Sequence, residues 1–339
     1  MEHEPLDRSD IEQLSRAGII PAEKREASIA AFRDQIEWRR WTTVWSGAIG
    51  AILLMAGVVF FFASNWKEMS PFWRFFVLEG ALIATVVAAC LRGIRTPVGQ
   101  WLLAGATVFT GVLFAVHGQI YQTGADAFEV FAWWTGLSLL WVVLARFAPL
   151  WIFWLAVAET ALALYIGQVF LPRESFEDPY LFLILGAVTL LALITWEWLS
   201  SREGFGWLSE GWIRITLVAA TVFWFTLLPW SWIFEFGHHG KRLDASYFFG
   251  TASWIILMIG LAFFYLVKRG HLIAFSLPIL SVAIILVCAI GRALLDKGPT
   301  NAGDFLITGL AGILLFSAAA AGIIRASRYL RPESGNTES

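Results

Sequence analysis

The 339 residues are 58% hydrophobic and only 15% charged, and the mean hydropathy is +0.68. Soluble domains average about 25% charged residues, and a soluble fold of this length has too little interior to bury so much apolar surface. The net charge of −2, with dispersed Lys and Arg, gives no basis for a nucleic-acid partner. The composition therefore predicts an all-α polytopic transmembrane helix bundle whose main partner is the lipid bilayer.

The first 40 residues are polar and have no cleavable signal peptide. Ser9 and Glu12 have capping-box spacing, and Pro21 suits the first turn of a second helix. We expect residues 1–40 to form a short cytoplasmic helical hairpin. Its apolar stripe, Ile29, Phe32 and Ile36, is compatible with docking of a cytoplasmic protein partner or with a stabilising cap on the membrane face.

After Arg40 the chain alternates between apolar runs and short polar breaks, and most runs approach the 20 or so residues needed to cross a bilayer. Only Arg146 and Pro149 separate the fourth run from the fifth, so nine to eleven spans stay open. The ten predicted spans are 43–64, 75–91, 101–121, 128–145, 147–171, 179–199, 212–233, 247–267, 271–291 and 305–324. We expect one five-span module in residues 41–171 and a second five-span half in 172–339 with a short cytoplasmic tail.

The distribution of Lys and Arg predicts the orientation. With ten spans, 17 of the 24 Lys and Arg residues lie on the side of the N-terminus and 7 on the other side. Positive charge is enriched in cytoplasmic loops, so both termini are expected in the cytoplasm. Nineteen Trp residues fit this arrangement, because most flank the breaks where indole rings prefer the headgroup level. Four deeper ones are expected to pack between helices: Trp133, Trp134, Trp141 and Trp254.

Glu159 is the most deeply placed carboxyl group. Twelve uncharged residues on each side put it about 18 Å from either end of its span, near the midplane. An acidic residue there costs on the order of 2.5–3.5 kcal/mol on insertion scales. Since no Lys or Arg lies at comparable depth, a protonated carboxyl hydrogen-bonded to a neighbouring helix is the least costly arrangement. Glu159 is thus either a proton- or cation-coupled site or a structural link between helices.

A second group of polar residues is expected at the outer ends of the second, third and fourth spans. His117 and Tyr121 are four residues apart and share a helix face. The group could form an outward-facing pocket that binds a divalent metal or relays protons, or a polar rim at the water interface. Its members are Glu79, His117, Gln119, Tyr121, Asp126 and Glu129. Two further ionisable residues, Glu197 and Arg214, lie near span ends, and Arg214 is close enough to the interface to be able to snorkel.

Signatures of catalysis are missing from the sequence. It has no phosphate-binding Gly-rich loop, no G-x-S-x-G elbow and no H-E-x-x-H pair, so no catalytic residue and no cofactor is expected. Cys90 and Cys288 lie in apolar runs and are expected to be buried small hydrophobes.

Three short motifs carry a family resemblance. They are A-G-I-I after Leu14, F-F-A-S-N-W at 61–66 followed by Pro71 and Arg74, and G-Q-I-Y at 118–121. Over about residues 10–165 the chain resembles the bacterial membrane proteins grouped as domain of unknown function 2157, and Asn65, Trp66, Gln119 and Tyr121 match its pattern. The resemblance implies a bacterial inner-membrane protein with no assigned reaction.

Two main functions follow from these features. One is a membrane scaffold or sensor that uses the cytoplasmic hairpin and the outward-facing polar pocket. The alternative is a proton- or cation-coupled transporter or permease that uses midplane Glu159, because ten spans with both termini inside is a common transporter layout. An intramembrane enzyme is the third hypothesis, and the sequence does not indicate an oligomeric state.

Overall fold

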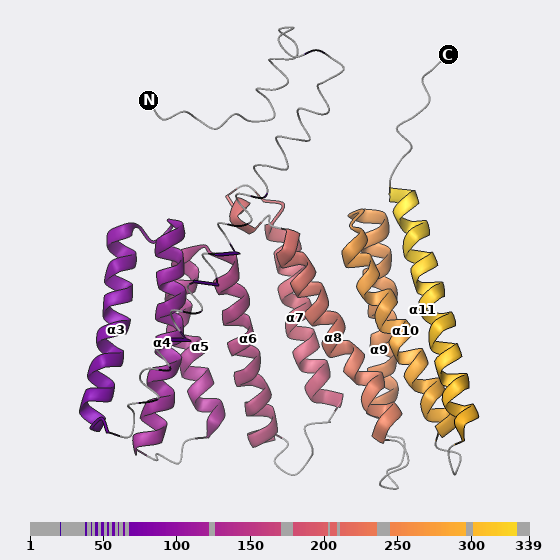
Figure 1. The fold of residues 1–339 in the computed structure, drawn as a ribbon, viewed down its shortest axis with the longest axis horizontal. Helices are drawn as coiled ribbons and strands as arrows, with labels where there is room; N and C mark the ends of the chain where they lie inside the picture. Colours follow the sequence, from indigo (N-terminus) through magenta and orange to yellow (C-terminus); the bar gives the residue numbers. More distant parts are fainter. Residues whose placement is uncertain are drawn as a thin grey trace. The chain divides into compact units, whose positions relative to one another are not determined.

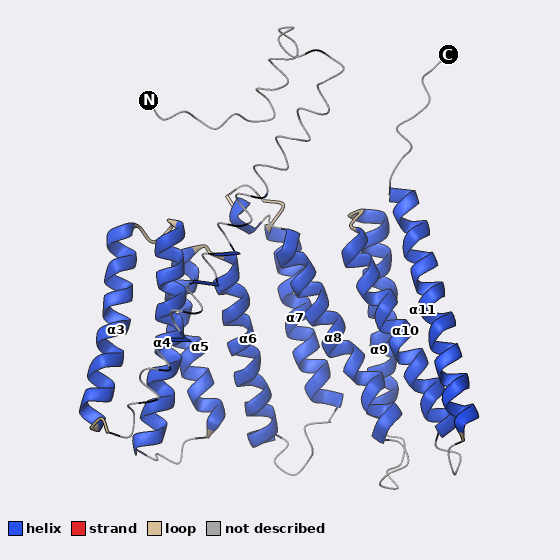
Figure 2. Ribbon diagram, in the orientation of Figure 1, coloured by secondary structure: helices blue, strands red, loops and turns tan. Residues whose placement is uncertain are grey.

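The computed structural model describes residues 68–121, 126–170, 179–202, 204–208, 211–235, 245–295 and 301–330, and single positions between 21 and 64. This part of the chain is helical apart from short turns, which confirms the all-α class (Figure 2). The predicted hairpin of residues 1–40 and the predicted span 43–64 lie almost entirely outside the described residues.

Within the described residues, nine helices are long and apolar enough to cross a membrane, and they coincide with the second to tenth predicted spans (Figure 1). Helices α6 and α9 each end in a π-helical turn, and a short 3-10 turn, η3 (Gly206–Leu208), precedes α8. The helices are α3 (Pro71–Arg92), α4 (Pro97–Tyr121), α5 (Ala127–Ala145), α6 (Ala148–Tyr165) with η2 (Ile166–Phe170), α7 (Pro179–Leu199), α8 (Gly211–Glu235), α9 (Ala245–Phe263) with η4 (Phe264–Lys268), α10 (Leu272–Leu295) and α11 (Ala302–Leu330).

The break between α5 and α6 is sharp although only three residues produce it. Arg146 adopts a left-handed conformation with φ 45°, Phe147 is extended, and Pro149 lies in the first turn of α6. A left-handed residue ends a helix, and Pro has no N–H to lose in a first helical turn. The separation of the fourth and fifth predicted spans is therefore confirmed.

The chain divides into two compact units, residues 1–77 and 78–339. In the second unit α8 is the central helix, since it packs against α7, α9 and α10. The largest apolar core surrounds it, with Val218, Leu228 and Tyr265 almost fully buried. Helices α4, α5 and α6 pack in sequence, and α6 also contacts α7, so α6 joins this row to the bundle around α8.

Close helix contacts depend on small residues facing large aromatic ones. A Cβ atom on Gly111 of α4 would lie 2.4 Å from the Trp134 ring of α5, and one on Gly186 of α7 would lie 2.7 Å from the Phe225 ring of α8. Between membrane helices, where lipid is as apolar as the side chains, such packing provides much of the association energy.

Interior Trp residues also donate hydrogen bonds between helices. Trp134 Nε1 donates to Thr107 O at 2.7 Å, and Trp254 Nε1 donates to Ser281 Oγ at 3.0 Å. The interior positions predicted for Trp134 and Trp254 are thus confirmed. The prediction for Trp133 is wrong, because its side chain is 63% exposed. Consecutive residues of a helix point about 100° apart, so a neighbour of a buried Trp can face outward.

Candidate functional site

Glu159 lies in the middle of α6 and forms a hydrogen bond with α8. The indole Nε1 of Trp224 donates to Glu159 Oε2 at 3.2 Å. The other carboxyl oxygen, Oε1, is hidden and has no hydrogen-bond partner among the described residues. The expected hydrogen bond from a neighbouring helix is therefore present, and its donor is a group that neither accepts a hydrogen bond nor titrates.

The hydrogen bond between Glu159 and Trp224 lies in the seam where α6 and η2 adjoin the bundle around α8. At one end of the seam the rings of Trp151 and Trp207 lie 6.4 Å apart, centroid to centroid. At the other end Ile166 packs in the same apolar cluster as Leu185. Any change in the charge of Glu159 therefore acts on the interface between α6 and the bundle around α8.

The residues expected at an outward-facing pocket all have exposed side chains: Glu79, His117, Gln119, Tyr121, Asp126 and Glu129. Two of them are in contact, since the rings of His117 and Tyr121 lie 4.7 Å apart. No three His, Cys, Asp or Glu residues in the described part of the chain lie close enough to hold a metal ion. The pocket and its metal-binding alternative stay predictions.

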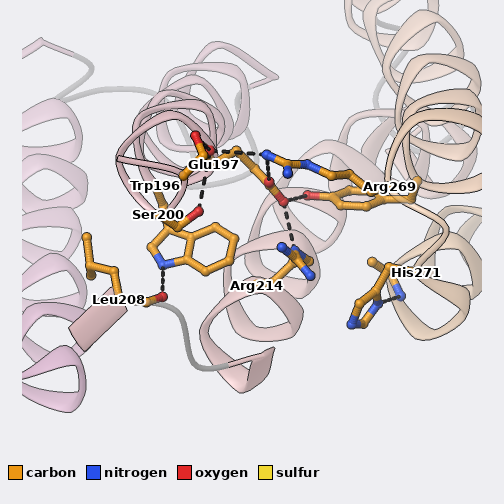
Figure 3. A network of polar contacts seen from close by, with 10 residues as sticks. Trp196, Glu197, Ser200, Leu208, Arg214, Arg269 and His271 are labelled. Atoms are coloured by element: carbon orange, nitrogen blue, oxygen red, sulfur yellow. Dashed lines mark hydrogen bonds and ion pairs between the residues drawn. The ribbon is translucent and has the colours of Figure 1, made fainter. Parts of the chain in front are cut away.

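The densest polar network of the described residues surrounds Glu197, at the end of α7 (Figure 3). Arg214 Nε, from α8, lies 2.9 Å from Glu197 Oε1, and Arg269 Nη2, after η4, lies 2.7 Å from Oε2. Tyr265 Oη donates to Oε1 at 3.1 Å. Arg269 Nη2 also donates to the backbone oxygen of Glu197 at 3.2 Å, which satisfies one of the free carbonyls at the end of α7. One carboxylate thus ties together α7, α8 and η4.

Burial and charge make this network a strong connection. The Glu197 side chain is 9% exposed and Tyr265 is fully buried, whereas the side chains of Arg214 and Arg269 are 20% and 33% exposed. A carboxylate removed from water needs charged and hydrogen-bonded partners, and Glu197 has both. Arg214, which the sequence placed near the start of its span, has Glu197 as an ion-pair partner there.

His271 adjoins the same end of the bundle and caps the start of α10. Its Nδ1 accepts a hydrogen bond from the backbone N–H of Ala274 at 3.3 Å. Burial lowers the pKa of the imidazole below its usual value, and the positive charge of Arg214 adds to this effect, while Glu197 opposes it. His271 is therefore held in the neutral form, which is the form that can accept the capping hydrogen bond.

Sequence reasoning noted two members of the network but not Tyr265, Arg269 or the network itself. Glu197 and Arg214 were noted as ionisable residues at span ends, and Arg269 follows a later span. One signal was available, because all three lie at helix ends on the same predicted side of the membrane. The contacts join residues up to 72 positions apart, which no local pattern connects.

The first part of the chain matches a known protein family. Residues 12–151 match the family described as Predicted membrane protein (DUF2157). The resemblance expected from the three short motifs is confirmed. Comparisons with curated proteins and with solved structures gave no match. The DUF2157 region includes α3, α4, α5 and the start of α6, so Glu159 and the Glu197 network lie outside it.

Proposed function

We propose that this membrane protein is a sensor or scaffold of the bacterial inner membrane in which protonation of Glu159 changes the contact between α6 and α8. The observation that carries the proposal is the hydrogen bond from Trp224 to Glu159. It links α6, the helix that follows the DUF2157 region, to α8, the centre of the second bundle.

The chemistry of the two groups supports a proton-dependent contact. A protonated carboxyl is neutral and can accept from the indole with one oxygen while its O–H donates elsewhere. An ionised carboxyl in an apolar seam needs water or a cation, because an unpaired buried charge is costly. Loss of the proton would therefore open or hydrate the seam between α6 and α8, whereas Trp224 has no titratable group at any physiological pH.

A second function is favoured by the hidden Oε1 of Glu159, which has no hydrogen-bond partner among the described residues. A proton- or cation-coupled transporter requires a carboxyl oxygen near the midplane that is not already bound by the protein and can bind the proton or cation. The two functions differ in one respect: a transporter moves protons or cations across the bilayer, and a sensor changes shape without net movement.

The deciding experiment uses purified full-length protein reconstituted in vesicles and the variant Glu159→Gln, which keeps the volume and a hydrogen-bond acceptor. Spin labels at Thr160 of α6 and Phe223 of α8, both exposed positions, report the distance across the seam. For a sensor we expect a pH-dependent distance that is lost in Glu159→Gln, together with no proton or cation flux. Flux that disappears in Glu159→Gln would establish the transporter instead. A pH-independent distance without flux would overturn both functions, and Glu129→Gln, an exposed carboxyl on α5, serves as the control.

The proposal places both termini in the cytoplasm and makes residues 1–40 a docking element for a cytoplasmic protein. The count of positive charges supports this orientation. In a background without Cys90 and Cys288, a cysteine at Ser201 should be protected from an impermeant thiol reagent in intact cells, and one at Asn301 should react. The reverse pattern would invert the topology.

A further inference from the structure

We propose that the Glu197 network is the floor of a binding site for the phosphate group of an anionic phospholipid. The proposal does not depend on the function of Glu159. It starts from the hydrogen-bond donors of the arginines at the ends of α7, α8 and η4 that have no acceptor among the described residues.

Each arginine uses only part of its guanidinium group within the described part of the chain. Arg214 contacts Glu197 through Nε alone, so both terminal nitrogens are left over. Arg269 contacts Glu197 through Nη2, so Nε and Nη1 are left over. The guanidinium group of Arg202, in the turn after α7, lies over the Trp198 ring at 4.4 Å, and its side chain has no hydrogen bond or ion pair with the described residues. Arg214 and Arg269 bind the two oxygens of one carboxylate, so their remaining donors belong to a single cluster at the start of α8 and the end of η4.

The net charge of the network matches a phosphodiester. Arg214 and Arg269 carry two positive charges and Glu197 carries one negative charge, which leaves one positive charge in a partly buried place. A phosphodiester has a single negative charge and would neutralise it. The planar fork of Arg binds phosphate oxygens in pairs, and here Glu197 already orients both forks.

The surrounding charges are mixed, so bulk attraction cannot explain such a site. Lys268 is exposed beside Arg269, while Glu203 and Glu210, which come between α7 and α8 in the sequence, lie outside the described residues. The sequence around the network, residues 196–214 and 264–271, has four Lys and Arg residues against three Glu. The proposal therefore rests on directed donors rather than on a strongly basic surface.

The position of the network favours a lipid over a soluble phosphate. Trp198, at the end of α7, and Trp212, at the start of α8, are 57% and 38% exposed. Exposed indole rings at span ends lie at the level of the lipid headgroups. Basic pockets between helix ends at this level are known places for acidic lipid headgroups. A lipid would place its phosphate near the arginines while its acyl chains follow the apolar sides of the helices.

The test measures lipid binding by native mass spectrometry of the detergent-purified full-length protein, titrated with phosphatidylglycerol, phosphatidylcholine or inorganic phosphate. We expect phosphatidylglycerol to bind at least about tenfold more tightly than phosphatidylcholine, whose headgroup has no net charge. In Arg269→Lys the ion pair with Glu197 is retained but the fork is lost, so phosphatidylglycerol affinity should fall about tenfold, the value of one charge-assisted hydrogen bond. The matched control Arg325→Lys, an exposed residue of α11, should bind like the wild type.

A second variant keeps the proposal testable if Arg269→Lys unfolds. Arg202→Gln removes a cation that touches only the Trp198 ring and should weaken phosphatidylglycerol binding about fivefold. Equal binding of phosphatidylcholine, or equal losses in Arg269→Lys and Arg325→Lys, would overturn the site. Inorganic phosphate that binds as tightly as phosphatidylglycerol would overturn the lipid assignment and leave a soluble anion as the ligand.

Discussion

Replacement of Glu197 by Gln tests whether the network at the end of α7 stabilises the bundle. Gln keeps the volume and one oxygen that can accept from Tyr265, but it removes the negative charge that Arg214 and Arg269 share. Removing one partner of a fully buried ion pair costs about 3–5 kcal/mol. The two arginine side chains are 20% and 33% exposed, so water solvates them in part when Glu197 no longer carries a charge. We therefore expect the free energy of unfolding to fall by about 2 kcal/mol.

The loss is measured as the free energy of unfolding in mixed micelles titrated with sodium dodecyl sulfate. Tyr265→Phe removes a single hydroxyl donor to the same carboxylate and should cost about 1 kcal/mol. Glu129→Gln, at an exposed position in the first turn of α5, should change stability by less than about 0.5 kcal/mol. A Glu197→Gln protein as stable as Glu129→Gln would refute the view that the ion pairs hold α7, α8 and η4 together.

Two further predictions concern the ends and the contacts of helices. The pKa of His271 is lowered in the folded protein, so the unfolded chain binds more protons as pH falls through about 6.5, and the stability should decrease below that pH. The variant His271→Asn can still accept the capping hydrogen bond from Ala274 and should flatten the profile of melting temperature against pH. An unchanged slope would exclude His271 as the cause. Gly111→Ala places a Cβ 2.4 Å from the Trp134 ring and should lower the free energy of unfolding by about 1–3 kcal/mol in the same titration. The control Gly105→Ala, which has open space at its Cβ, should be neutral or stabilising, and equal effects of the two variants would contradict the close contact of α4 and α5.

The sequence determined the membrane class and the helices because both depend on local composition. A span needs about 20 consecutive apolar residues, so the second to tenth predicted spans agree with the helices to within a few residues. The break at Arg146 and Pro149 could be predicted for the same reason, because each residue affects the backbone conformation at its own position. The family resemblance was visible in three short motifs.

The tertiary structure decided which faces of the helices meet, and thereby the partners of the charged residues. Glu159 was recognised from its depth, but its donor, Trp224, lies 65 positions away. Trp133 and Trp134 are indistinguishable by depth, yet one is exposed and the other packs on Gly111. In a membrane the apolar residues surround every helix, so no hydrophobic stripe marks the buried face as it does in a soluble protein. The helices could therefore be found from the sequence, and the network at Glu197 could be found only from their packing.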